Sequence, residues 1–513
     1  MRPRSGDWRT SSVGEGGGRN QGRSLVREAV SPRLEENRRR VRERLGYGIT
    51  YDVLVKDLEI GGREAFLLGI DGFVDTQVMN QVAMFLLSTE REEIAPLSAG
   101  RVERRRLGFI ETERTPDFDR AVELVLAGQI ALFLEGLEEA ILIDARSYPE
   151  RQVGEPDQEK VVRGPRDGFV ETLVRNTALL RRRLRDPSFR AEIFPVGRRS
   201  RTDVALVYLA DLASPRILEN VRRRLHRIEV DGLPMAEKSL EEFLTAEKKW
   251  WNPFPVVRYT ERPDVAAVHL LEGHVVILVD TSPVAMILPA SFFHHIQHAE
   301  EFHQDVAVGV LFRLARYLAL LLAWVGTPLW LALALGREAL PEPWRVIGPR
   351  QPSAVPLMWQ FLIGEGVVEL IRMALIHTPT GLTTAMGVIG AVLLGQLAVQ
   401  VGLFSAEAVL YVTLSALGFF AIPSPEMASA IRLCRLVYLV AAGVGGFTGL
   451  GVAFLFTLLL LLLTDSFGLP YLWPLWPPHL PALAHMLFRQ PVPAVKRRLP
   501  FFRQKDPTRI SRD

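Results

Sequence analysis

Long apolar runs in the second part of the chain constrain its fold more than any other feature. A helix needs about 20 consecutive apolar residues to cross a hydrocarbon core of roughly 30 Å. Four runs without Asp, Glu, Lys or Arg meet or approach this length: 317–336, 381–402, 408–425 and 436–464. The sequence therefore predicts an α-helical multi-pass membrane domain, which we place at residues 309–488.

The run at residues 436–464 is too long for one upright helix. Its 29 residues would extend about 43 Å at 1.5 Å per residue. We expect the run either to tilt strongly or to fold as a tight hairpin near the glycine cluster between Gly443 and Gly451. Within that cluster, Gly445 and Gly449 have the GxxxG spacing that favours close helix packing.

Residues 354–376 are apolar but carry charges. Glu365 and Glu369 share one helix face, and Arg372 follows three positions later. This pattern is typical either of an amphipathic helix on the membrane surface or of a span that faces a wet interior. We therefore expect four to six membrane helices.

The region before the apolar runs alternates helical and β-rich segments, which indicates a mixed α/β fold. The strand candidates are 52–59, 129–134, 140–144, 191–195, 204–209, 275–280 and 284–288. The helix candidates are 75–89, 117–127, 169–184, 214–228 and 262–271.

A faint internal repeat divides this soluble region. Residues 121–145 align with residues 266–290, anchored on Gly128 and Gly273. Each copy has a helix, a glycine stop, an apolar strand, a short acidic turn and a second apolar strand. We infer two similar cytosolic α/β subdomains. Their expected boundaries are 47–155 and 161–303.

Both ends of the chain are basic. Residues 1–46 hold twelve Arg and six acidic residues, and residues 489–513 hold eight Lys or Arg and two Asp. The first segment has no apolar stretch that could act as a signal peptide, so we expect a disordered tail there and a basic cytoplasmic tail at the other end. Beside a membrane, anionic lipid and the positive-inside rule explain such tails better than nucleic acid does. We expect no nucleic-acid partner.

Patterns that indicate catalysis are weak, and we expect no enzyme activity, cofactor or metal. The single cysteine, Cys434, excludes an intrachain disulfide and a CxxC motif. His294 and His298 lie four positions apart, with Glu301 or His303 nearby, as metal ligands on a helix would. The HExxH order is missing, however, and the place just before the first apolar run favours a structural or interfacial role.

A second motif consists of Arg163, Gly164, Pro165 and Arg166. Two guanidinium groups next to a helix N-terminus can hold an anion. The alternative is a turn whose arginines pair with nearby acids such as Asp167 and Glu171.

Polar side chains within the apolar region form the third candidate. Such residues are costly in a membrane and usually face an interior path or a partner helix. The candidates for a pore or polar membrane face are Gln396, Gln400, Glu365 and Glu369. Hydrogen bonds between helices and an interfacial position are the alternatives.

Several long stretches resemble the GerA family of bacterial spore germination proteins, at its A-subunit type. The stretches are VVRGPRDGFVETLVRNTALLRRRL (161–184), 250–283, 377–405 and PYLWPL (470–475). The amino-acid sequences of residues 250–283 and 377–405 are most similar to a sporulation-specific branch of that family. The resemblance covers residues from about 50 to about 500.

This resemblance implies a multi-pass protein of the spore inner membrane with a cytoplasmic N-terminal domain. It implies a homo-oligomeric, pore-forming subunit that releases monovalent cations or amplifies germinant-receptor signalling, with a small membrane protein or other germination proteins as partners. The family has no catalytic residues to transfer. Gln396 matches a polar position of its membrane core, and Arg163–Arg166 match a motif that we interpret as an interface between subdomains. A membrane-anchored scaffold or sensor and a secondary transporter are the competing hypotheses.

Overall fold

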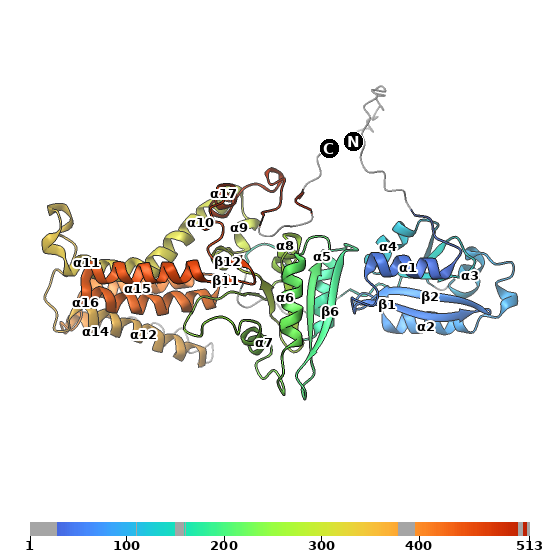
Figure 1. The fold of residues 1–513 in the computed structure, drawn as a ribbon, viewed down its shortest axis with the longest axis horizontal. Helices are drawn as coiled ribbons and strands as arrows, with labels where there is room; N and C mark the ends of the chain where they lie inside the picture. Colours follow the sequence, from blue (N-terminus) through green and yellow to red (C-terminus); the bar gives the residue numbers. More distant parts are fainter. Residues whose placement is uncertain are drawn as a thin grey trace, which may run out of the picture.

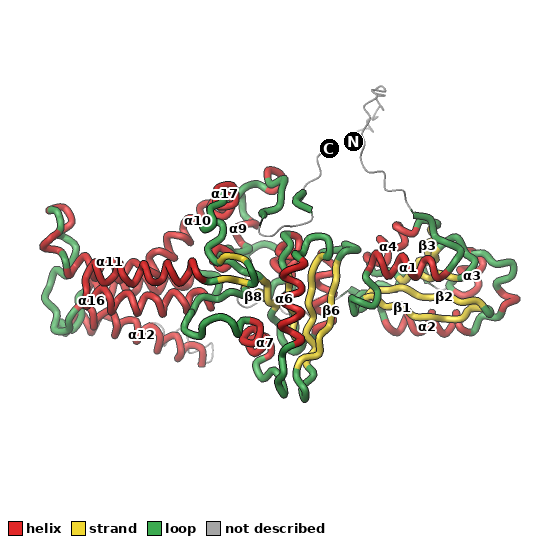
Figure 2. Tube along the Cα trace, viewed as in Figure 1, coloured by secondary structure: helices red, strands yellow, loops and turns green. Residues whose placement is uncertain are grey.

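The computed structural model describes residues 28–108, 110–148, 159, 161–377, 395–500 and 506–509. These residues form an elongated molecule with two α/β units and a helical bundle in line (Figure 1). The first unit (residues 28–148) lies at one end, the bundle (residues 306–463) at the other, and the second unit (residues 159–303) between them. Figure 2 shows that the long strands belong to the two α/β units.

The first unit is a five-stranded antiparallel sheet with helices on both faces. The strands are β1 (Val53–Ile60), β2 (Arg63–Ile70), β3 (Thr112–Thr115), β4 (Ile130–Leu134) and β5 (Ala140–Ile143), in the order β1-β2-β4-β5-β3. Helices α1 (Leu34–Leu45) and α4 (Phe118–Leu126) bury their apolar side chains on one face. Helices α2 (Thr76–Leu87) and α3 (Ala99–Arg106) cover the other face.

The second unit repeats this strand order. Its strands are β6 (Phe189–Val196), β7 (Thr202–Leu209), β8 (Arg258–Thr260), β9 (Val275–Val279) and β10 (Ala285–Leu288), in the order β6-β7-β9-β10-β8. Its helices are α5 (Leu173–Arg183), α6 (Pro215–His226), α7 (Ala236–Leu244) and α8 (Pro263–Leu271). The aligned sequence repeat corresponds to α4-β4-β5 in the first unit and to α8-β9-β10 in the second. The α6–α7 face of the sheet shares one apolar core with the nearer end of the bundle.

The predicted α/β class of the soluble region is confirmed, with some elements missed. The prediction omitted β2, β3 and β8 and helices α1, α3 and α7. Strand β2 escaped because its last six residues are all buried, so the alternation that marks a half-buried strand is absent.

Residues 34–45 correct one expectation, because they form α1 rather than part of a disordered tail. Leu34, Val41 and Leu45 lie on one face of α1 and are buried. The arginines that dominated the composition occupy the remaining faces. Residues 1–27 lie outside the described part of the chain.

The bundle begins with one continuous helical run. It comprises α10 (Val306–Leu321), the π-helical turn η3 (Leu322–Gly326) and α11 (Thr327–Leu335). The other bundle helices are α12 (Leu357–His377), α14 (Gly395–Gln400), α15 (Ala406–Phe420) and α16 (Pro425–Leu463). After the bundle come β11 (Asp465–Ser466), β12 (Leu469–Pro470) and α17 (Leu480–Leu487). Short turns of helix are η1 (Arg91–Glu93), η2 (Phe292–His295), α9 (Glu300–His303), η4 (Arg337–Ala339), η5 (Glu342–Trp344) and η7 (Val492–Ala494).

By length and composition, two helices in the described ranges could cross a membrane, at 306–335 and 425–463. The sequence predicted four to six. Helix α12, which carries Glu365, Glu369 and Arg372, is not one of these two, and α15 is apolar but short. Most of the predicted span at 381–402 lies outside the described residues, and only its end is seen, as α14 and the turn that follows.

Helix α16 folds back on itself at Gly446. This residue has φ 56° and ψ −137° within an otherwise helical segment. A Cβ placed on Gly449 would lie 2.1 Å from the carbonyl oxygen of Ala441, whereas eight residues of straight helix span about 12 Å. Of the two expected forms, the structure therefore adopts the hairpin, with arms on either side of Gly446.

Candidate functional site

A buried ion pair lies inside the helical bundle. Glu365 of α12 pairs with Arg435 of α16, and their side chains are only 4% and 1% exposed. The Arg435 guanidinium also lies 4.2 Å from the ring centroid of Phe419. A charge in such surroundings needs a partner, because its desolvation is otherwise uncompensated.

The π-helical turn η3 supplies a third component. In a π-helical turn the carbonyl of residue i accepts a hydrogen bond from the N–H of residue i+5. For Ala323 that residue is Pro328, which has no N–H group. The Ala323 carbonyl is thus available to side chains. It accepts from Arg435 Nη1 at 3.2 Å and from Ser415 Oγ at 3.4 Å. The irregular turn and the buried arginine therefore satisfy each other.

A second, more exposed cluster lies one turn further along α12. Glu369 pairs with Arg372 of the same helix and with Arg432 of α16. The structure thus brings the two predicted glutamates together, but it gives each of them an arginine partner from α16. The sequence did not single out Arg432 and Arg435, because they lie just before the uncharged run at 436–464 and look like ordinary charges that flank a membrane span. The available signal was their spacing. The two arginines lie three positions apart on one helix face, as the two glutamates lie four apart on another, so the two pairs can face each other.

The two predicted glutamines lie on another helix. Gln396 and Gln400 both belong to α14 and are exposed in the single chain. They share one face by their spacing of four. They are therefore separate from the Glu365–Arg435 pair.

The residues of the His294–His303 segment, considered as metal ligands and interpreted as structural or interfacial, have separate partners. His294 Nδ1 accepts from the backbone N–H of Ser291 at 3.0 Å, and His298 Nδ1 accepts from that of Glu300 at 3.1 Å. Glu301 is fully buried and pairs with Arg313, at 2.7 Å, and with Arg316. Among the described residues, no group of three His, Cys, Asp or Glu side chains is placed to hold a metal.

His294 instead belongs to a buried group of imidazoles that sequence reasoning missed. Its ring centroid lies 5.0 Å from that of His274 and 5.7 Å from that of His269. Burial lowers the pKa of His274 to about 4 and holds the pKa of His269 and His294 well below the usual range. Burial thus favours the neutral form of these rings, in line with a structural role.

The Arg163–Arg166 motif forms a loop of the second unit. Helix α5 begins only at Leu173, and the Leu173 N–H already donates to Asp280 Oδ1 at 3.1 Å. This N–H group is therefore not free for an anion, and an anion site at the motif stays a prediction. The Pro165 carbonyl accepts from Arg262 Nη2 at 3.2 Å, and Gly164, with φ +139°, leaves room for the His303 ring.

Of the two acids suggested as partners for the motif's arginines, Asp167 binds Arg183 at 2.6 Å. Arg163 and Arg166 are exposed. The motif's contacts with Arg262 and His303 lie within the second unit. An interface role between the two subdomains stays a prediction.

Comparisons with known proteins cover most of the chain. A family model described as Bacillus/Clostridium GerA spore germination protein matches residues 39–501. Stage V sporulation protein AF of Bacillus subtilis (strain 168) is 42% identical over 461 residues, which cover 90% of this chain and 93% of that protein. Spore germination protein B1 of the same organism is 31% identical, covering 85% of this chain and 90% of that protein. The predicted family and its sporulation branch are confirmed.

A solved structure shows a weaker likeness. It is the N-terminal domain of the A subunit of the Bacillus megaterium spore germinant receptor GerK3, with 23% identity and a TM-score of 0.42. The match covers 52% of this chain and 98% of that domain.

Proposed function

The chain belongs to the GerA family of spore germination proteins, and we propose that it is a subunit of an oligomeric pore in the spore inner membrane. In this proposal the pore releases monovalent cations during germination, or amplifies the signal of germinant receptors. The α/β units face the cytoplasm, and the bundle crosses the membrane several times. Relatives named as spore germination proteins, and one named as a membrane protein, support this placement.

The outer surface of the bundle supports the membrane placement. Large apolar side chains are exposed along every long bundle helix, among them Leu318, Leu370, Leu417, Val437 and Leu455. Large apolar side chains exposed on several helices of one bundle indicate contact with lipid or with another protein. The hairpin of α16 adds to this argument, since its two arms supply two apolar segments.

The observation that carries the pore proposal is the exposed pair Gln396 and Gln400 on α14. In lipid such amide groups would be left without hydrogen bonds. One polar helix face cannot enclose a channel, but a ring of copies places that face around a common axis. Homo-oligomers with a small membrane protein or other germination proteins as partners fit this arrangement.

A membrane-anchored scaffold or sensor is the second candidate. It is favoured by the pairing of Glu365 and Glu369 with arginines of α16, because paired carboxylates hold helices together and do not line a path. A secondary transporter has less support, since the repeat lies in the soluble units. We propose no enzymatic activity for the chain.

Potassium release from liposomes tests the pore. The purified full-length protein is reconstituted with any co-purifying partner, and Gln396→Leu is compared with the parent. Gln81→Leu is the matched control, since Gln81 is exposed on α2 of the first unit. Release that needs the protein and changes only in Gln396→Leu supports the pore. An inserted, oligomeric protein that releases no potassium favours the scaffold instead.

A further inference from the structure

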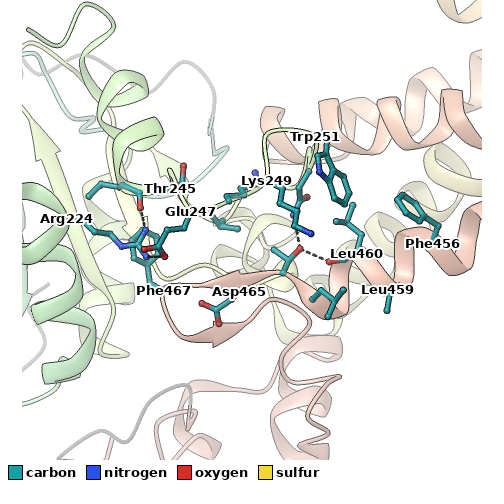
Figure 3. A pocket seen from close by; sticks show the side chains of 16 residues that line it. Arg224, Thr245, Glu247, Lys249, Trp251, Phe456, Leu459, Leu460, Asp465 and Phe467 are labelled. Atoms are coloured by element: carbon teal, nitrogen blue, oxygen red, sulfur yellow. Dashed lines mark hydrogen bonds and ion pairs between the residues drawn. The ribbon is translucent and has the colours of Figure 1, made fainter. Parts of the chain in front are cut away.

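A cavity of about 330 Å³ lies where the end of α16 meets the second unit (Figure 3). One wall is the last two turns of α16, with Phe456, Leu459 and Leu463. The other is the loop after α7, residues 245–252. The walls are tied together at two points. The rings of Trp251 and Phe456 stack at 6.1 Å, and Asn252 Nδ2 donates to Thr464 Oγ1 at 2.8 Å.

The α16 wall is apolar and open. Phe456 is 57% exposed and Leu463 is 74% exposed. On the loop, Trp250 is 95% exposed beside Trp251. Paired tryptophans next to an apolar helix end are typical of the boundary between membrane and water, where the ring sits at the level of lipid headgroups.

The other end of the cavity is cationic. Arg224, Lys248 and Lys249 line it against two carboxylates, Glu247 and Asp465. Glu247 is paired with Arg224 at 2.6 Å, and Asp465 Oδ2 accepts from the Gly468 N–H at 2.7 Å.

Lys248 and Lys249 are the two other cationic residues of the cavity. Within the described ranges neither forms an ion pair, although Lys249 lies 5.3 Å from the ring centroid of Trp251. Burial lowers the pKa of Lys248, because its ammonium group is partly removed from water and the charge of Glu241 offsets only part of this effect. An anion in the cavity would compensate this desolvation.

We infer that this cavity binds an anionic phospholipid, with its phosphate between Lys248 and Lys249 and an acyl chain along Leu459 and Leu463 of α16. The inference rests on the membrane placement of α16 under the proposed function. A zwitterionic headgroup fits less well, because its own cation would offset the attraction of the lysines for the phosphate. The lipid would fasten the second unit to the membrane surface and to the end of the hairpin.

Binding of phosphatidylglycerol to the full-length protein in detergent, counted by native mass spectrometry, tests the site. Phosphatidylcholine with the same acyl chains and soluble glycerol 1-phosphate are the comparison ligands. We expect the parent to prefer phosphatidylglycerol, and the double variant Lys248→Gln/Lys249→Gln to bind it roughly thirty-fold more weakly, since each basic residue at an anionic surface contributes several-fold to affinity.

The matched control is Lys56→Gln/Arg105→Gln, which removes two exposed charges from the first unit and should bind like the parent. Equal binding by the lysine variant and the control would overturn the inference. So would glycerol 1-phosphate that competes as well as the lipid, because the cavity would then be a site for free phosphate.

Flotation with phosphatidylcholine vesicles separates the two proposals. A parent protein that floats but shows no preference for phosphatidylglycerol refutes the lipid site alone. A protein that does not float refutes the membrane placement as well.

Discussion

Asp52 and Arg181 form a bidentate ion pair that joins the two α/β units. Arg181 Nε and Nη2 donate to the two carboxylate oxygens of Asp52, each at 2.9 Å, and the side chains are 2% and 0% exposed. Thr50 Oγ1 donates to the same carboxylate at 2.6 Å. Tyr51 adds a hydrogen bond to Thr177 Oγ1 at 2.6 Å. These contacts indicate a fixed relation between the units.

Replacing Arg181 with Met should destabilise the protein strongly. The change leaves the Asp52 carboxylate buried without its partner, which costs about 3–5 kcal/mol. Thermal unfolding of the full-length protein measures the loss. Arg198→Met is the control, because Arg198 pairs with Asp231 on the surface and such pairs contribute at most about 1 kcal/mol. Equal effects of the two changes would contradict a structural role for the buried pair.

The pair inside the bundle should behave in the same way. Arg435→Met leaves Glu365 uncompensated and removes the donor to the Ala323 carbonyl, so we expect a loss of about 3–5 kcal/mol. In Arg372→Met, Glu369 keeps Arg432, and we expect about 1 kcal/mol or less. Unfolding temperatures in detergent distinguish the two variants. The prediction fails if Arg435→Met and Arg372→Met unfold at the same temperature.

Gly446→Ala should disturb the hairpin of α16. Its φ of 56° and ψ of −137° are open to glycine and strained for alanine, at about 1–3 kcal/mol. Gly451→Ala is the control, since no atom lies within 4 Å of the added methyl group. Protease sensitivity and unfolding temperature report the difference. A Gly446→Ala variant with the same protease sensitivity and unfolding temperature as the parent would argue against this turn.

Acid should weaken the second unit through its buried histidines. Burial, aided by the charge of Arg258, lowers the pKa of His274 to about 4 and of His295 to about 3, whereas unfolded imidazoles titrate near 6.5. Between these values the unfolded chain binds more protons, so stability present above pH 6.5 falls as the pH drops towards 4.

Unfolding temperatures between pH 7.5 and 4.5 check this dependence. We expect His274→Gln to show a shallower decline than the parent, since it removes one of the groups that take up protons on unfolding. His226→Gln changes an exposed residue of α6 and should keep the slope of the parent. A parent stability that is flat over this range would rule out the neutral, buried state of these histidines.

The local elements with regular patterns could be predicted from the sequence. Apolar runs, glycine stops and the repeat between residues 121–145 and 266–290 indicated the α/β units and the apolar bundle, because such periodicity reflects burial directly. Strand β2 and helix α1 escaped, since the burial of β2 is continuous and the Arg-rich composition of α1 concealed its apolar face. The candidate site was half predicted. Glu365 and Glu369 were found, but their partners were not.

The sequence alone determined the family and the division into an α/β part and an apolar part, and it limited residues 436–464 to a tilted helix or a hairpin. The structure decided for the hairpin and placed its turn at Gly446. Only the tertiary structure decided which charges meet. Arg181 lies 129 positions from Asp52 and Arg435 lies 70 from Glu365. A contact across such separations depends on how whole elements pack, and the spacing of residues within one element does not specify which other element it will meet.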